Sequence, residues 1–177
     1  MKNVLSVALA ILLLFSSAAV AADQDQLDHP SCDFCGMHRV KFAHSRMLVE
    51  YTEGDAVGTC SIRCMAVEFA NAIDRIPKNI KVGDLNSKHL IDAEKAVWVL
   101  GGERQGVMTK RAKWAFADKT AAEAFVTEQG GEIVDFDRAM TAAYEDMYKD
   151  TKMIRKKRAA KRKNQTPSAP MKMQVDQ

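Results

Sequence analysis

The spacing of apolar residues predicts three strands and one helix in the first part of the chain. Residues 46–53 (RMLVEYTE) alternate in polarity and are rich in strand-forming residues, which predicts a β-strand. A Gly-Asp pair at residues 54–55 predicts a turn, and residues 56–59 predict a short return strand. Residues 61–76 begin with a serine suited to an N-cap, have apolar residues at helical spacing and stop before a proline. We expect this helix to lead into a short strand at residues 80–82.

A similar order of patterns follows in the second part of the chain. The continuous apolar run at residues 96–100 (AVWVL) predicts a buried strand, and residues 112–116 (AKWAF) predict its neighbour. Residues 120–129 predict a helix that two glycines terminate, and residues 133–136 predict another strand. A last helix is expected to begin near Asp137 and to end in the basic run that follows.

The order strand, strand, helix, strand therefore occurs twice, at about residues 46–83 and 96–136. Neither part contains the long crossover that a doubly wound parallel sheet requires. The sequence predicts an α+β fold made of two small ββαβ halves with mixed sheets, followed by a C-terminal helix and a basic tail.

The N-terminal residues indicate export. Lys2 precedes an apolar run at residues 4–15, and small residues follow it. This pattern is typical of a secretory signal peptide over residues 1–22, cleaved near Ala21 or Ala22. The run is shorter than the roughly 20 residues that cross a bilayer, and no cysteine follows it for lipidation. We expect a soluble periplasmic protein that is not a lipoprotein.

Charge is unevenly distributed along the chain. Residues 149–163 contain nine basic residues against the single Asp150, whereas residues 23–148 contain 15 basic and 21 acidic residues. The small net charge of +3 thus combines an acidic body with a basic tail. Such a tail can make peripheral contact with an anionic membrane, or it can be a solvated, partly helical extension. Export makes nucleic acid an unsuitable partner.

Four cysteines form two close pairs, Cys32 with Cys35 and Cys60 with Cys64. Close pairs are typical of metal sites and redox motifs, whereas structural disulfides usually close longer loops. With Ser61 as the N-cap, Cys64 would be the third residue of a helix. There the helix dipole is expected to lower the pKa of its thiol.

Methionines near these cysteines favour a copper site. Met37 lies two residues after Cys35, and Met108 lies in a glycine-containing loop where no core residue is needed. A thioether is neutral and binds Cu(I) well but Zn(II) poorly. Met65 follows Cys64 on the apolar side of its helix and is interpreted as a core residue.

Histidines are the other candidate ligands. His29, His38 and His44 flank the first cysteine pair, and His89 lies alone in a polar loop. His29 and His38 could complete a site, although an isolated histidine is more often solvated or satisfied in the core. The sequence contains no phosphate-binding glycine motif and no pairing of nucleophile with base, so we do not expect an enzyme.

These patterns divide the chain into four predicted parts. The four parts are residues 1–22, a signal peptide; residues 23–95, an N-terminal metal-binding half with the CxxCGM and CSxxC motifs; residues 96–148, a C-terminal ββαβ half and helix; and residues 149–177, a basic and largely disordered tail.

These motifs together resemble the NosL family, the accessory proteins of nitrous oxide reductase. The resemblance extends over about residues 30–137 and depends on the order of several motifs. They are CGM at residues 35–37, CSIRC at 60–64, VWV at 97–99, GVM at 106–108, and the block at 116–131 with its paired glycines. The first half alone also resembles the TRASH/YHS metal-binding modules.

The resemblance implies a periplasmic Cu(I)-binding chaperone that delivers copper to an apo-metalloenzyme, by default nitrous oxide reductase or its assembly proteins. It also implies a fold of two ββαβ halves. The family motifs correspond to Cys35, Met37 and Met108 of this chain, which are the expected Cu(I) ligands.

Three features depart from the family pattern. Family members are typically lipoproteins, and many have a single functional cysteine, whereas this chain adds Cys32, Cys60 and Cys64. These could make a different or a second site. The basic C-terminal extension is the third departure.

Two other functions are compatible with the cysteines. A structural zinc site would use all four thiols and would support folding. Thiol–disulfide exchange would use Cys32 and Cys35, but such sites are followed directly by a long helix, which Gly36 and Met37 would interrupt.

Overall fold

A computed structural model of the chain describes residues 23–165. The expected signal peptide and residues 166–177 lie outside the described residues. Among residues 23–165, no helix is both long and apolar enough to cross a lipid bilayer.

The first half is a four-stranded sheet with two helices. Its elements are α2 (Gln24–Asp28), β1 (Met47–Tyr51), β2 (Ala56–Thr59), α3 (Ile62–Asn71), β3 (Pro77–Gly83) and β4 (Leu90–Asp92). The strand order is β2-β1-β3-β4, with Val49 of β1 opposite Val57 of β2 and Ile80 of β3. The sequence predicted neither α2 nor β4, because each is short and has no pronounced apolar period.

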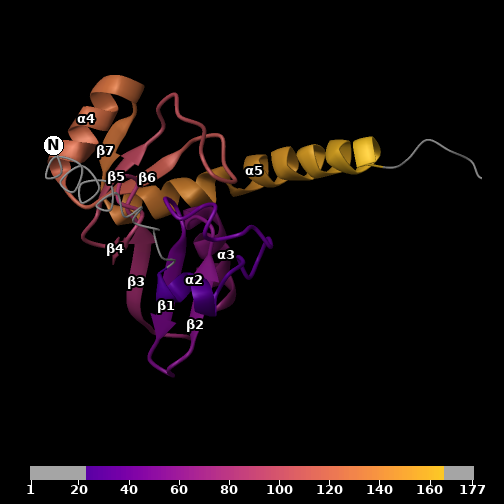
Figure 1. Ribbon diagram of the computed structural model, residues 1–177, viewed down its shortest axis with the longest axis horizontal. Helices are drawn as coiled ribbons and strands as arrows, with labels where there is room; N and C mark the ends of the chain where they lie inside the picture. Colours follow the sequence, from indigo (N-terminus) through magenta and orange to yellow (C-terminus); the bar gives the residue numbers. More distant parts are fainter. Residues whose placement is uncertain (1–22, 166–177) are drawn as a thin grey trace, which may run out of the picture.

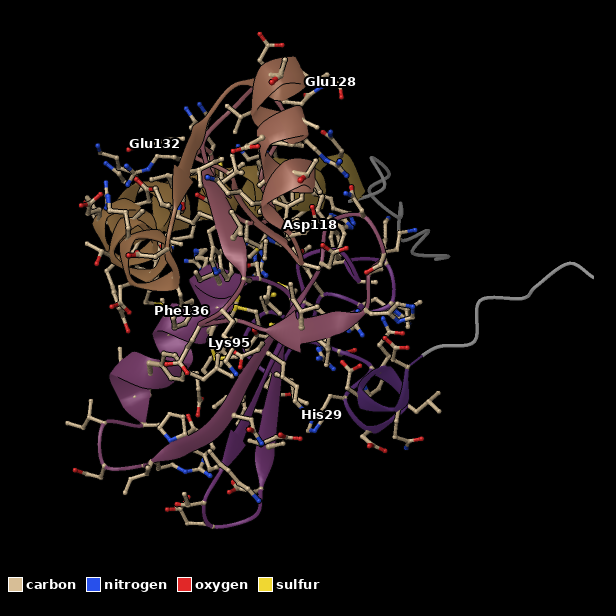
Figure 2. All side chains as sticks on the ribbon, turned by 90° about the vertical axis from the view of Figure 1, so that its left-hand side faces the viewer. His29, Lys95, Asp118, Glu128, Glu132 and Phe136 are labelled. Atoms are coloured by element: carbon tan, nitrogen blue, oxygen red, sulfur yellow. The ribbon has the colours of Figure 1, made fainter. Side chains whose placement is uncertain are left out.

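The second half is a three-stranded sheet with one helix, and a long helix follows it. Its elements are β5 (Val97–Leu100), β6 (Lys113–Phe116), α4 (Lys119–Gln129) and β7 (Glu132–Val134), and the last helix is α5 (Phe136–Gln165). The strand order is β6-β5-β7. Figure 2 shows α4 extending from Asp118 to Glu128, and β7 leading from Glu132 back toward Phe136 at the start of α5.

The predicted α+β class and the predicted repeat are confirmed. In each half the first strand is central and pairs with the second strand and with the strand that follows the helix. Every strand pairing among residues 23–165 is antiparallel, however, so the expected mixed sheets are not found. The helix returns the chain to the far side of the central strand, so that the third strand runs opposite to it. Strand order along the sequence does not reveal which strand is central.

Two of the predicted helices begin near the expected residues but end at different ones. Helix α3 ends at Asn71 instead of near Ile76, and Ile73 and Ile76 are exposed. Helix α5 continues to Gln165, through residues predicted to be a largely disordered tail. Its basic run contains Lys, Arg, Ala and Met, which are good helix formers, and no Gly or Pro interrupts it.

The main apolar core joins the two halves. It contains Met47 and Met65 from the first half, Trp98 from β5 and the first three turns of α5. Phe136 packs against Trp98, with 5.9 Å between the ring centroids. A smaller core around Trp114 and Phe125 lies in the second half, and Leu85 from the loop after β3 also belongs to it. Figure 1 shows α5 passing between the two halves and then projecting beyond the body.

Candidate metal centre

The segment CDFCGM at residues 32–37 forms a closed turn. The Cys32 N–H donates to the Met37 carbonyl at 2.8 Å, and the Gly36 N–H donates to the Cys32 carbonyl at 2.9 Å. Gly36 has a φ of 72°, which a glycine adopts without steric cost. This turn holds the thiols of Cys32 and Cys35 near each other.

The turn is attached to the end of β2. The Asp33 N–H donates to the Gly58 carbonyl, and the Gly58 N–H donates to Asp33 Oδ2, both at 3.1 Å. Cys60 follows two residues after Gly58, at the junction between β2 and α3. The attachment therefore places the first cysteine pair beside the second.

The second pair lies where α3 begins. Ser61 is the N-cap residue, as predicted, but its side chain makes no capping hydrogen bond. Cys64 is the third residue of α3, and its N–H donates to the Ser61 carbonyl at 3.0 Å. One helical turn thus separates the two thiols and leaves both on the inner side of the junction.

The structure brings all four predicted cysteines together. Their Sγ atoms lie within 4.8 Å of one another, so the two cysteine pairs form one group. The Sγ atoms of Cys35 and Cys60 are 3.4 Å apart, and those of Cys60 and Cys64 are 3.8 Å apart. Tetrahedral coordination with metal–sulfur bonds of about 2.3 Å separates the sulfurs by about 3.8 Å. All four are free thiols, and of the four only Cys35 is not buried.

Hydrogen bonds among the thiols lower the pKa of two cysteines and contribute to raising that of the other two. Cys35, Cys60 and Cys64 donate to the Cys32 sulfur, which lowers the pKa of Cys32. The pKa of Cys35 is lowered to about 7: its hydrogen bond to Cys32 raises the value, but those from Cys60 and Cys64 more than offset this effect. Donation to Cys32 and Cys35, together with burial, raises the pKa of both Cys60 and Cys64.

The predicted low pKa of Cys64 is therefore wrong. The helix N-terminus is present, but the neighbouring sulfurs and burial determine the direction of the shift. The neighbouring thiols lower the pKa of Cys32 in the CxxC turn, instead of that of Cys64 at the start of α3.

Met37 and Met108 both pack against the thiol cluster, together with Phe42 and Val107. Both methionines are partly buried. Met108 has a φ of 62°, a left-handed conformation that is uncommon for residues other than glycine. Such backbone conformations persist where the surrounding structure fixes them, often at functional sites. Met65, by contrast, is fully buried in the main core, which confirms its interpretation as a packing residue.

The histidines lie outside the group of four thiols. His38 and His89 are exposed, and His29 lies at the end of α2 beside Gly58. His44 is half-buried, with its ring 5.7 Å from that of Trp114. Burial and the positive charges of Arg104 and Lys88 lower the pKa of His44.

A groove of about 490 Å³ lies beside the cluster. Met37 and Met108 line it, and α5 contributes Met153 and Ile154. Arg158 Nη2 donates to the Cys35 carbonyl at 3.2 Å. Sequence reasoning did not select Met153, because it lies in the basic run and is far from every cysteine. The pair Met153-Ile154 is the one signal that the run has an apolar face there.

Two buried arginines support the cluster and were also not predicted. The side chains of Arg39 and Arg46 have no exposed surface, and both form ion pairs with Asp25, with nitrogen–oxygen distances of 2.8 and 2.9 Å. Arg39 Nε also donates to the carbonyl of Thr59, the residue before Cys60, at 3.2 Å. Since Asp25 is separated from Arg46 by 21 residues, nothing local indicates the pairing.

Comparison with known proteins identifies the family. The model of the NosL family matches residues 24–144, which is most of the chain. The fold is similar to the crystal structure of the copper chaperone NosL from Shewanella denitrificans, with a TM-score of 0.50 and 26% sequence identity. That similarity covers 66% of this chain and 93% of the other. No curated protein sequence matches this chain significantly. The resemblance deduced from the motifs is confirmed, and the chain belongs to the NosL family.

Proposed function

We propose that this protein binds Cu(I) in the periplasm and delivers it to an apo-metalloenzyme. The observation that supports this proposal most directly is the sulfur environment, in which Met37 and Met108 pack against four clustered thiols. Thiolates and thioethers are the ligands that Cu(I) prefers. Membership of the NosL family and similarity to a copper chaperone add independent support.

The cluster is open at one edge, as release of an ion to a partner requires. Cys32, Cys60 and Cys64 are buried, whereas Cys35 is partly exposed next to Met37. A partner's ligand can approach the ion at this edge and replace the protein's ligands in turn. Copper keeps its oxidation state in such an exchange. A thiol that binds the ion releases its proton to water and takes up a proton when the ion leaves.

The proposed Cu(I) ligands are Cys35, Met37 and Met108. One thiolate and two thioethers give Cu(I) a site without net charge. Cys32, Cys60 and Cys64 are proposed as further sulfur ligands, since their Sγ atoms belong to the same group. Because these three cysteines are buried, an ion bound to them would be farther from solvent than an ion bound at Cys35.

The proposed recipient is nitrous oxide reductase or one of its assembly proteins, on the basis of the family. Its test is transfer. Copper-loaded protein is mixed with the apo-enzyme, and the copper content of the enzyme is measured after separation. Copper should move from the protein to the apo-enzyme faster than it does from a copper–chelator complex at the same concentration.

Competition for Cu(I) tests the binding proposal. The reduced protein should remove Cu(I) from a chromogenic chelator, and Cys35→Ser and Met37→Leu should each weaken binding. Met65→Leu is the matched control, because Met65 follows Cys64 but its side chain is buried in the main core. Absence of competition, or unchanged affinity in Cys35→Ser and Met37→Leu, would contradict the proposal.

A structural zinc site is the second candidate function. The observation in its favour is the spacing of the four Sγ atoms, three of which belong to buried cysteines. This function predicts zinc in protein purified without added metal, unfolding on chelation, and no effect of Met37→Leu. Metal analysis combined with thermal unfolding in a chelator distinguishes it from copper delivery, since a copper chaperone should stay folded when its cargo is removed.

A further inference from the structure

Helix α5 contributes a third methionine to the groove beside the thiol cluster. Met37, Met108 and Met153 line this space of about 490 Å³ from three different segments of the chain. Met153 is half-buried, although its neighbours Lys152 and Arg155 are exposed. The family model ends at residue 144, so this part of α5 is a feature of this chain outside the matched region.

Ion pairs fix the middle of α5 against the second half. Asp146 accepts from Arg111 Nε at 2.8 Å and from Lys113 Nζ at 2.9 Å. The buried Asp150 accepts from the Lys110 N–H at 3.1 Å. These contacts join α5 to the residues that follow Met108, and they hold the helix and the methionine loop in one arrangement.

Two further contacts fix α5 against the first half. Arg63 of α3 donates to the Thr151 hydroxyl at 2.7 Å, and Arg158 donates to the Cys35 carbonyl at 3.2 Å. Met153 lies between these two anchor points along the helix. Contacts on both sides of Met153 along α5 therefore fix its position in the groove.

We propose that Met37, Met108 and Met153 form a second soft-metal position in this groove, at which Cu(I) enters or leaves the thiol cluster. The choice of copper rests on the proposed function. The arrangement of the three side chains around the groove rests on the structure alone. Three neutral thioethers select a soft monovalent ion, and they require no deprotonation to bind it.

The charges around the groove make this position weaker than the thiol cluster. Lys157 and Arg158 line the same groove, so a cation bound to neutral thioethers is repelled there. The thiols can lose protons and compensate the charge of the ion, whereas the thioethers cannot. Copper that enters the groove is therefore drawn toward the cysteines, and it returns to the groove when a partner competes for it.

Silver(I) is a suitable probe, because it is a soft monovalent ion that does not change oxidation state in the experiment. The full chain, labelled with ¹³C at the methionine methyl groups, is titrated with silver(I) and followed by NMR. The signals of Met37 and Met108 should shift with the first event, because both are proposed ligands of the ion at Cys35. They should shift again, together with the signal of Met153, when further silver(I) enters the groove. Met153→Leu should weaken this second event about tenfold, the scale on which loss of one group around a metal acts.

Met147→Leu is the matched control, since Met147 lies on the same helix but packs against the main core. It should leave both binding events unchanged. A Met153 signal that does not shift when silver(I) is added beyond the amount that fills the cysteines would overturn the groove site and leave the proposed function intact. Failure of the thiols to bind silver(I) or Cu(I) would overturn the proposed function itself.

Discussion

The two halves have the same topology, and they differ most at the junction between the second strand and the helix. In the second half this junction is Ala117-Asp118, and the Asp118 side chain accepts from the Ala121 N–H at 2.8 Å. In the first half the corresponding residues are Cys60, Ser61 and Cys64, and the Ser61 side chain makes no capping bond. The junction in the second half caps its helix, whereas the junction in the first half carries cysteine thiols.

The comparison shows how one supersecondary unit supports two roles. The second half is stabilised by an ordinary cap and by an apolar core to which Leu85 of the first half also contributes. In the first half, the start of α3 lies at the thiol cluster and has no side-chain cap. The buried ion pairs of Arg39 and Arg46 with Asp25 stabilise this half instead. The repeat provides the scaffold, and substitutions at one junction, together with the preceding CxxC turn, provide the chemistry.

The largest expected effect is on the buried ion pairs of the first half. Asp25→Asn should lower the free energy of unfolding by about 3 kcal/mol, because the buried Arg39 guanidinium loses its carboxylate partner and the buried Arg46 guanidinium is left with that of Asp23. Chemical denaturation measures the change. Asp28→Asn, an exposed change on the same helix, should remain within about 0.5 kcal/mol of the parent protein. Equal effects of the two changes would show that the ion pairs do not stabilise the site.

The same carboxylate should make stability depend on pH. Burial raises the pKa of Asp25, but hydrogen bonds and charges from Arg46 and Arg39 more than offset it, so the pKa lies below its usual value. The folded state thus binds this proton less readily than the unfolded state. The stabilisation should be complete above about pH 4 and be lost as the pH falls through the lower pKa of the folded protein. Asp25→Asn should remove this part of the acid sensitivity.

The next effect compares the two junctions directly. Cys60→Ser should weaken Cu(I) binding by about 100-fold, or about 2.8 kcal/mol, because it removes a sulfur that lies 3.4 Å from that of Cys35 and 3.8 Å from that of Cys64. Ala117→Ser introduces the same residue at the corresponding position of the second half and should leave the affinity unchanged. Chelator competition measures both, with circular dichroism as the check on folding. Equal affinities would show that the first junction is not the metal site.

The smallest expected effect concerns helix capping. Asp118→Ala should lower the free energy of unfolding by about 1 kcal/mol, because it removes the hydrogen bond to the Ala121 N–H. Ser61→Ala should cost less, since Ser61 makes no capping bond. Thermal unfolding of the two variants side by side measures the difference, and a larger loss for Ser61→Ala would reverse the comparison.

Features that depend on local pattern were predictable from the sequence. The paired spacing of Cys32 with Cys35 and of Cys60 with Cys64 indicated a four-thiol group, and the apolar periods indicated both ββαβ halves. Features that depend on contacts distant in sequence were not predictable. The pairing of Asp25 with two arginines is one example.

The approach of Met153 to the groove is another such feature. It depends on how far α5 continues and on which side of the helix faces the cysteines. The pKa of Cys64 was wrongly predicted for a related reason, because the helix N-terminus is a local feature whereas the neighbouring sulfurs come from the CxxC turn.

X-ray absorption at the copper edge of the protein loaded with one equivalent of Cu(I) tests the central proposal most directly. The predicted result is a Cu(I) ion with sulfur neighbours only, whose number decreases when Cys35→Ser or Met37→Leu is introduced. A shell dominated by nitrogen or oxygen would contradict the proposal. So would a sulfur shell that neither substitution changes.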